Sequence, residues 1–326
     1  MDKILLSIII PVYNVGGYIQ RCVDSIIQQE CSFPLEILLI DDGSTDDSFV
    51  RCNQISKTNS IVKTIRQENK GVSSARNRGI AESRGKWIWF IDGDDYLLPN
   101  SLKMISNHLD GDNDILAFAY IHEIDETSKR VVLPSEENVT RYSGIHYINT
   151  SYSSPTIWSY VFKRSLIQDN NVRLSEKLKY GEDKIFILEC LYYAQNIHMI
   201  YEPIYEYAYR AESAVNNKNT RIVTDQLESI KVLIKIIHDK KLSVRVFDSQ
   251  ITYILWLYLH LLSSTINQES YGEKEKELYK YCHDYQYWNP ILFTLIHFRS
   301  FALNHHGGII KRIVRGIQKY QINKYI

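Results

Sequence analysis

The sequence predicts an α/β fold, in which a mostly parallel sheet flanked by helices precedes a mainly helical C-terminal region. Short, almost uninterrupted apolar runs rich in β-branched residues recur along the first 120 residues, which is typical of strands buried on both faces of a parallel sheet. Amphipathic stretches separate these runs. From Thr224 onward, apolar residues recur mainly at helical spacing.

Four apolar runs predict strands, namely Leu5–Ile10, Leu35–Ile40, Trp87–Ile91 and Ile115–Ile121. Between the first two, Gly17–Gln29 has apolar residues at helical spacing, and Ser101–His108 follows the same pattern. The alternation of strands and helices implies right-handed crossovers within one sheet. We expect a polar loop or an edge hairpin over residues 120–150.

The length of 326 residues suits about two domains, at roughly 150 residues per domain. We place the boundary in the polar stretch Asn216–Thr220, which gives a first domain at 1–218 and a helical region at 219–326. Lys and Arg together number 38, and so do Asp and Glu, so no overall field would attract nucleic acid. The five cysteines form no CxxC pair, which favours a reducing, cytoplasmic location.

Polar clusters follow three of the predicted strands: Pro11-Val12-Tyr13-Asn14, Asp41-Asp42-Gly43-Ser44 and Asp92-Gly93-Asp94-Asp95. Ligands of open α/β sheets bind beyond the carboxyl ends of the strands, so these clusters predict a ligand site. Ordinary turn preferences explain any one cluster but explain three together poorly.

Two of these clusters contain carboxylates suited to ligand binding. Asp92 and Asp94 flank a glycine and can face one hard cation, Mn²⁺ or Mg²⁺, although Asp-rich turns are also common without a metal. Asp42 can accept a hydrogen bond from a base or a ribose hydroxyl. Its segment can equally begin a helix with Ser44 or Thr45 as the cap, and both roles can hold together.

The segment Asn69–Gly79 contains a glycine and an arginine that suit a nucleotide. Gly71 lets the backbone approach a ligand, and Arg76 offers a planar fork for a phosphate or a uracil carbonyl. The alternative is an ordinary capped helix with an exposed arginine.

Four motifs occur in a fixed order: SIIIPVYN at 7–14, IDDGSTDDS at 40–48, ENKGVSSARNRGI at 68–80 and GKWIWFIDGDDYLLPNSL at 85–102. Together they resemble glycosyltransferase family 2, the inverting nucleotide-sugar enzymes of the GT-A fold, over about residues 5–215. The resemblance implies a nucleotide-sugar-binding part at about 1–120 and an acceptor and base part at about 121–218.

The resemblance also assigns roles to single residues. It implies a nucleotide-sugar site made of Pro11, Tyr13, Asn14, Asp42, Gly71, Arg76, Asp92 and Asp94. In that site Tyr13 lies near the base, Asp42 accepts from a uracil N–H, and Asp94 with Asp92 holds Mn²⁺ or Mg²⁺ on the pyrophosphate.

Two further segments resemble the acceptor part of the family. Gly181–Phe186 is similar to its GED-x-x-F segment, and the stretch from Trp158 to Arg164 is similar to the segment that precedes it, which makes Trp158 and Lys163 acceptor-side candidates. A carboxylate that removes the acceptor proton contributes roughly 10²–10⁴-fold to the rate. The resemblance assigns this role to Asp183, with Glu182 as the fallback; the alternative is that the pair caps the following helix.

The expected function is a metal-dependent inverting transfer of a sugar from a nucleoside diphosphate donor, a UDP-sugar, to a hydroxyl of a glycan or lipid-linked glycan, as in bacterial surface polysaccharide synthesis. The alternative is a non-catalytic module that binds a nucleotide sugar or a glycan, and the retained carboxylates argue against it. A nicotinamide enzyme would need G-x-G-x-x-G after the first strand, where this chain has Pro-Val-Tyr-Asn.

Residues 309–326 contain five basic residues, no acidic residue and an apolar stripe at helical spacing. Such a helix can lie on an anionic membrane, which predicts peripheral contact with the inner face of the cytoplasmic membrane. The alternative is a helix that packs on the domain. No run of about 20 apolar residues predicts a transmembrane span.

Overall fold

The computed structural model describes residues 4–125, 127–135, 139–149, 154–209, 220–263 and 272–287. Its strands are β1 (Leu6–Val12), β2 (Leu35–Asp41), β3 (Val62–Arg66), β4 (Trp87–Phe90), β5 (Tyr96–Leu97), β6 (Ile115–Glu123), β7 (Lys129–Val132), β8 (Arg141–Tyr142), β9 (Tyr160–Lys163) and β10 (Ile197–Tyr207). Its helices are α1 (Gly16–Ile27), α2 (Ser48–Thr58), α3 (Val72–Glu82), α4 (Ser101–Ser106), α5 (Gly144–Asn149), α6 (Arg164–Asp169), α7 (Glu182–Tyr193), α8 (Thr220–Asp239), α9 (Val244–Ser263) and α10 (Gly272–Asp284), with a 3₁₀ turn at Ile157–Ser159.

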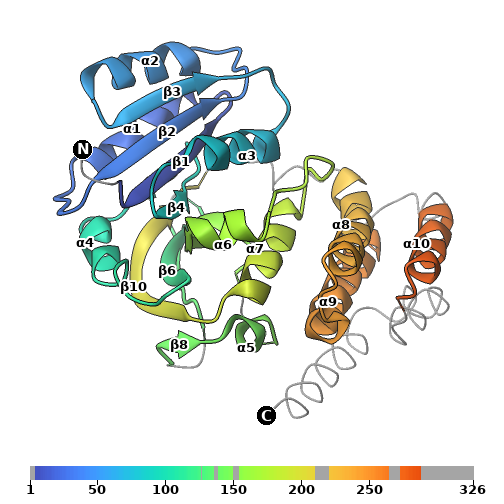
Figure 1. The fold of residues 1–326 in the computed structure, drawn as a ribbon. Helices are drawn as coiled ribbons and strands as arrows, with labels where there is room; N and C mark the ends of the chain where they lie inside the picture. The colour runs from blue at the N-terminus through green and yellow to red at the C-terminus, as the bar shows by residue number, and fades with distance from the viewer. Residues whose placement is uncertain are drawn as a thin grey trace.

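Within the described residues, the strands form one sheet in the order β3-β2-β1-β4-β9-β6-β10-β5, with β7 beside β6 and β8 beside β10. The first four strands in this order pair in parallel, as does β6 with β10, whereas β9 runs antiparallel to both β4 and β6. Helices flank the sheet, and α8, α9 and α10 lie together beside α7 (Figure 1). The predicted α/β class with a helical C-terminal region is confirmed.

The four predicted strands correspond to β1, β2, β4 and β6, because each is an apolar run with both faces buried over most of its length. The edge strand β3 was not predicted, since its sequence VKTIR is half polar. The long strand β10 also escaped prediction. Glu202 and Pro203 interrupt its pattern, and its register with β6 shifts on either side of Pro203.

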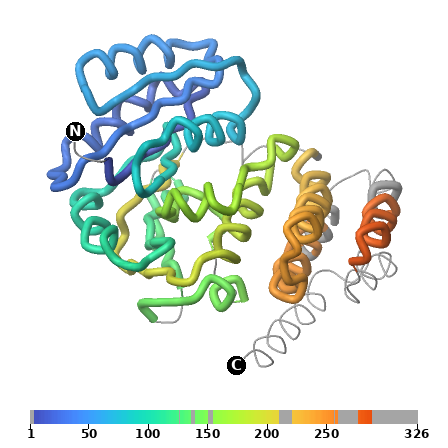
Figure 2. Tube along the Cα trace, viewed as in Figure 1, coloured from blue at the N-terminus to red at the C-terminus, as the bar shows by residue number. Residues whose placement is uncertain are grey.

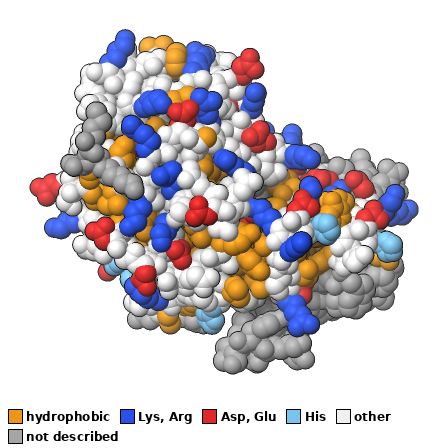
Figure 3. Space-filling view, viewed as in Figure 1, with side chains coloured by type: hydrophobic (Ala, Val, Ile, Leu, Met, Phe, Trp, Pro, Cys, Tyr) orange, Lys and Arg blue, Asp and Glu red, His pale blue; other side chains and the backbone are white. Residues whose placement is uncertain are grey.

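Side chains of β1 alternate between two hydrophobic clusters, as the two-residue period of a strand requires. Ile8 and Ile10 pack in the cluster that α1, α2 and α4 cover, whereas Ile9 packs in the cluster that α3, α5 and α7 cover. Basic and acidic side chains are interspersed over the face of the molecule seen in Figure 3, consistent with the balanced charge.

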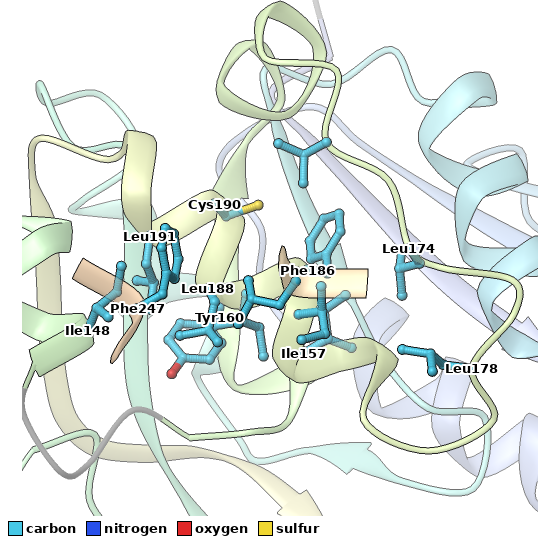
Figure 4. Packing of buried hydrophobic residues seen from close by; sticks show 14 of the residues in the cluster. Ile148, Ile157, Tyr160, Leu174, Leu178, Phe186, Leu188, Cys190, Leu191 and Phe247 are labelled. Carbon is cyan, nitrogen blue, oxygen red and sulfur yellow. The ribbon is translucent and has the colours of Figure 1, made fainter. Parts of the chain in front are cut away.

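The second cluster continues without a break into α8, α9 and α10. Phe247 of α9 stacks on Tyr192 of α7 with ring centroids 5.4 Å apart, and Figure 4 shows Phe247 beside Leu191 and Ile148. In its described part, the predicted region 219–326 therefore shares a hydrophobic core with the first domain. The trace in Figure 2 shows that α8 also lies next to α7.

Two sequence predictions concern residues that are not described. The proposed boundary lies mostly within 210–219, and the basic segment 309–326 lies wholly outside the described residues. Within the part of the chain that is described, no helix combines the length and apolarity needed to cross a membrane.

Candidate active site

The carboxyl ends of β1 and β2 are tied together by Asn14. This residue adopts a left-handed backbone (φ 52°), which asparagine tolerates better than most residues. Its side-chain oxygen accepts hydrogen bonds from the backbone N–H of Thr45 (2.9 Å) and Asp46 (3.4 Å), and its own N–H donates to Ser44 Oγ (3.2 Å). Asn14 thus joins two loops, next to a Tyr13 ring that is 49% exposed and a partly exposed Pro11.

Asp42 is 3% exposed and holds the loop that precedes α3. Its Oδ1 accepts from Gln67 Nε2 (2.8 Å) and from the N–H of Lys70 (3.0 Å), and its Oδ2 accepts from the N–H of Gly71 (2.8 Å). A carboxylate has about four lone-pair sites, so these three bonds leave the capacity to accept one more. The predicted contact with a uracil N–H stays a prediction.

Gly71 is the N-cap of α3 and has φ 92°, a conformation that side chains disfavour. Within the described residues, a Cβ added there would meet no atom within 4 Å, so the backbone faces open space.

The predicted helix cap at Ser44 or Thr45 is wrong. Helix α2 begins at Ser48 after its N-cap Asp47, and Asp46 Oδ1 accepts a hydrogen bond from the Ser48 N–H (2.9 Å).

Arg76, on the second turn of α3, is the centre of the site. It is 4% exposed, so the alternative of an ordinary surface arginine is wrong. Its Nη2 donates to Asp92 Oδ1 (2.8 Å) and its Nη1 donates to Asp183 Oδ1 (2.7 Å). The same Nη1 lies 3.8 Å from Glu182 Oε1, so one guanidinium is shared by three carboxyls.

Charge and burial act in opposite directions on these groups. Burial lowers the pKa of Arg76, but Asp183, Asp92 and Glu182 outweigh it and raise that pKa above its ordinary value. Burial raises the pKa of Asp92 and of Asp183, with Arg76 opposing the rise. Burial and the neighbouring Asp183 raise the pKa of Glu182 to about 8.

Asp183 lies in the first turn of α7, past the N-cap residue Gly181. Since glycine has no side chain and Asp183 follows the cap, the alternative of a capping role for Asp183 is wrong. Its Oδ1 meets Arg76, and its Oδ2 accepts weakly from the N–H of Ile157 (3.4 Å). The side chain of Asp183 remains 19% exposed, so part of it is open to solvent.

The Asp92–Asp95 turn is held from β10 and α1. Asp95 is 1% exposed and accepts from the Tyr205 hydroxyl (2.6 Å), which in turn accepts from the Asp92 N–H (3.3 Å). Arg21 of α1 donates to the backbone oxygen of Asp94 (2.7 Å). Sequence analysis missed Tyr205, whose only signal was a loose match of Tyr205–Arg210 to a tyrosine-rich family strand.

The Asp92–Asp95 turn carries carboxylates of the type that hard divalent cations prefer. In the described residues, no three His, Cys, Asp or Glu side chains are grouped to hold a metal. Asp92 and Asp94 nevertheless offer hard oxygen donors, and the charge of Asp94 is one of the causes that raise the pKa of Asp92, after burial. Such a pair suits a cation that completes its coordination with phosphate oxygens and water.

The two acceptor-side candidates occupy different places, Trp158 behind the Asp92–Asp95 turn and Lys163 at the opposite end of β4. Trp158 is 3% exposed and stacks on Tyr205 with ring centroids 4.5 Å apart, so it supports that tyrosine from behind. Lys163 pairs with Trp87 at the start of β4 and lies 3.3 Å from Asp114. Asp92 follows the other end of β4, about 16 Å away at roughly 3.3 Å per residue. The antiparallel direction of β9 therefore places Lys163 beside the end of β4 opposite to Asp92, and its acceptor role stays a prediction.

The mixed sheet, with carboxylates gathered beyond the ends of β1, β2 and β4, has the arrangement of a GT-A fold. The Glycosyl transferase family 2 model matches residues 7–170, and the chain belongs to this family.

Among curated relatives, the chain is 31% identical over 209 residues to the uncharacterized glycosyltransferase EpsJ of Bacillus subtilis, which covers 62% of this chain and 60% of EpsJ. It is 29% identical over 218 residues to the minor teichoic acid biosynthesis protein GgaB of Bacillus subtilis, covering 64% of this chain and 23% of GgaB. The chain thus spans less than two thirds of the length of these relatives.

Among solved structures, the crystal structure of S. aureus TarS 1-349 in complex with UDP-GlcNAc matches with a TM-score of 0.71 and 19% identity. The match covers 96% of this chain and 92% of that one, so the fold extends through the helical region.

Proposed function

We propose that the chain is an inverting glycosyltransferase that moves a sugar from a nucleoside diphosphate donor to a hydroxyl of a glycan or lipid-linked glycan in bacterial surface polysaccharide synthesis. The observation that carries the proposal is the Arg76 bridge between Asp92 and Asp183. The bridge joins the Asp92–Asp95 turn, which suits the diphosphate of the donor, to Asp183, the carboxylate that takes the proton of the acceptor hydroxyl in this proposal.

The donor is a UDP-sugar in this proposal. Three neighbouring groups support this choice. The side chain of Tyr13 is exposed, and the Asp42 carboxylate can accept one more hydrogen bond. Gly71, at the N-terminus of α3, has open space where a side chain would stand. These are the groups that stack on a base and accept from its N–H. The likeness to TarS, solved with UDP-GlcNAc, supports this choice of nucleotide.

Asp183 is the base that takes the acceptor proton. With a pKa of about 8, Glu182 carries its proton in most molecules at pH 7 and cannot accept another. Burial raises the pKa of Asp183 and so increases its basicity, while Arg76, whose Nη1 lies 2.7 Å from Asp183 Oδ1 and 3.8 Å from Glu182 Oε1, opposes that rise. The two neighbouring carboxyls thus have distinct roles.

Asp94 and Asp92 would hold Mn²⁺ or Mg²⁺. When bound, the cation supplies positive charge to the leaving nucleoside diphosphate. Arg76 contacts Asp92 Oδ1 and Asp183 Oδ1, so it fixes these two carboxyls relative to each other. The buried Asp95 and Tyr205 keep the turn fixed, so little reorganisation is needed at the moment of reaction.

The acceptor class rests on the relatives and on the sequence. GgaB is named for teichoic acid biosynthesis, which favours a cell-surface glycan as acceptor. The basic segment 309–326 suits a lipid-linked acceptor at the inner face of the cytoplasmic membrane.

The test is a donor panel. Melting temperatures are measured with UDP, GDP, dTDP and their sugars, with and without Mn²⁺, and release of nucleotide from each sugar donor is followed. We expect UDP with Mn²⁺ to raise the melting temperature and UDP-sugar turnover to require Asp183. Asp112→Asn, at a 70% exposed carboxylate, is the matched control for Asp183→Asn. Binding of a UDP-sugar with no turnover in any acceptor extract would favour the non-catalytic module instead.

A further inference from the structure

We propose that Asp225, on α8 in the helical region, is a positioning residue for Asp183. This inference rests on the proposed function, because it concerns the carboxylate that acts as the base. It makes the helical region part of the catalytic machinery of the first domain.

Asp225 accepts hydrogen bonds from the segment Lys179–Gly181, which leads into α7. The side chain is 5% exposed, and its Oδ2 accepts from the backbone N–H of Lys179 (3.0 Å) and of Tyr180 (3.1 Å). Arg221, one turn earlier on α8, places its Nε 3.6 Å from the same oxygen. Hydrogen bonds from backbone N–H groups to a carboxylate are charge-assisted, and such bonds are stronger than hydrogen bonds between two neutral groups.

The next residue in the segment touches α8 directly. Gly181 has φ 88°, and a Cβ added there would lie 2.8 Å from Ser229 Oγ. Ser229 is 2% exposed, and its hydroxyl donates to the backbone oxygen of Asp225 (2.7 Å), so it cannot easily move aside. The backbone before Glu182 therefore sits against α8 with no room for a side chain.

Asp183 is thus held from two directions. Arg76 holds its carboxylate from α3, and Asp225 and Ser229 hold the backbone two to four residues before it from α8. A displacement of a reacting group by about 1 Å can cost on the order of 100-fold in rate. Loss of the α8 contacts should therefore reduce turnover although Asp225 touches no reacting atom.

The rest of α8 has its own attachments, which makes the role of Asp225 separable from folding. Immediately after the C-terminal end of α8, Lys240 forms an ion pair with the buried Glu189 of α7 and donates to the backbone oxygen of Asn170 (2.6 Å). Leu227, Ile230 and Leu233 are buried in the shared core. These contacts remain when the Asp225 side chain is removed.

The experiment compares Asp225→Ala with Asp225→Asn in the full chain, measuring kcat, the KM for the donor, the Kd of UDP with Mn²⁺ and the melting temperature. We expect Asp225→Ala to lower kcat by on the order of tenfold or more with the Kd of UDP unchanged. Asp225→Asn should restore most of kcat, because its amide oxygen can accept from both N–H groups. Asp239→Ala is the matched control on α8, since Asp239 is 48% exposed and pairs with Lys235 of the same helix.

Gly181→Ala disturbs the same contact from the other side and serves if Asp225→Ala fails to fold. It should lower kcat and leave UDP binding intact. Wild-type kcat in either folded variant would overturn the inference, as would equal loss of UDP binding and kcat. Absence of turnover in the wild-type chain, with every donor, would instead contradict the proposed function.

Discussion

Arg76 and Asp183 are 107 residues apart in the chain, yet Arg76 Nη1 lies 2.7 Å from Asp183 Oδ1. The contact joins α3, which follows the third strand of the parallel half, to α7, which packs on the same face of the sheet. It explains why an arginine is buried at 4% exposure: the second nitrogen of its fork reaches Asp92.

Replacing the base should abolish turnover while leaving the nucleotide bound. Asp183→Asn keeps the shape of the side chain and removes its basicity, so we expect kcat to fall by roughly 10²–10⁴-fold. The Kd of UDP, measured by calorimetry with Mn²⁺, should change little. Glu182→Gln should retain most activity, because Glu182 is already protonated at pH 7. An active Asp183→Asn with an inactive Glu182→Gln would move the base one residue back.

Removing the guanidinium should destabilise the fold. Arg76→Ala leaves Asp92 and Asp183 without their shared partner in a buried setting, and breaking such a pair costs about 3–5 kcal/mol. Arg76→Lys should recover only part of this, because a single ammonium cannot serve both carboxylates with a planar fork. Urea denaturation monitored by circular dichroism measures the free energies of unfolding. Arg78→Ala, at a 52% exposed arginine, is the control, and equal losses in the two alanine variants would contradict the prediction.

Glu182 should make the fold less stable as the pH rises. The folded protein holds the Glu182 proton up to about pH 8, whereas the unfolded chain releases it near pH 4.5. Between these values the folded state binds the extra proton, so the free energy of unfolding falls with increasing pH. Denaturant titrations at pH 5, 6, 7 and 8 should show a steeper fall for the wild type than for Glu182→Gln. Parallel curves for the two proteins would refute the assignment.

The metal prediction concerns Asp94. Asp94→Ala removes one of the two carboxylates of the turn, so activity should fall by at least about 10²-fold if the cation supplies several kcal/mol. EDTA should abolish turnover in the wild type, and added Mn²⁺ or Mg²⁺ should restore it. The exposed Asp110 provides the matched control variant Asp110→Ala. Undiminished turnover in EDTA would exclude the metal role.

The basic segment 309–326 predicts a membrane contact that depends on charge. Its five basic residues at about 1 kcal/mol each should bind anionic liposomes at low salt and release them as salt increases. Truncation after His306 should remove liposome sedimentation and leave the melting temperature unchanged. A lowered melting temperature, with no sedimentation of the full chain, would indicate the alternative, a segment that packs on the protein.

The sequence by itself determined the parallel half of the sheet, because burial on both faces requires continuous apolar runs that can be recognised locally. It also determined which clusters end those strands, since Asn14, Asp42 and Asp92 lie within two residues of the ends of β1, β2 and β4. Glu182 and Asp183 were found through their resemblance to a family segment. Each of these features is encoded within a few consecutive residues.

Only the tertiary structure decided which of these residues meet. The burial of Arg76 between Asp92 and Asp183 depends on how α3 and α7 pack, and the distance of Lys163 from the site depends on the direction of β9. Asp225 belongs to an amphipathic helix whose sequence indicates no catalytic connection, and only its packing shows that it holds the segment before Asp183. Contacts between distant segments result from the packing of whole helices and strands, which no local pattern of residues encodes.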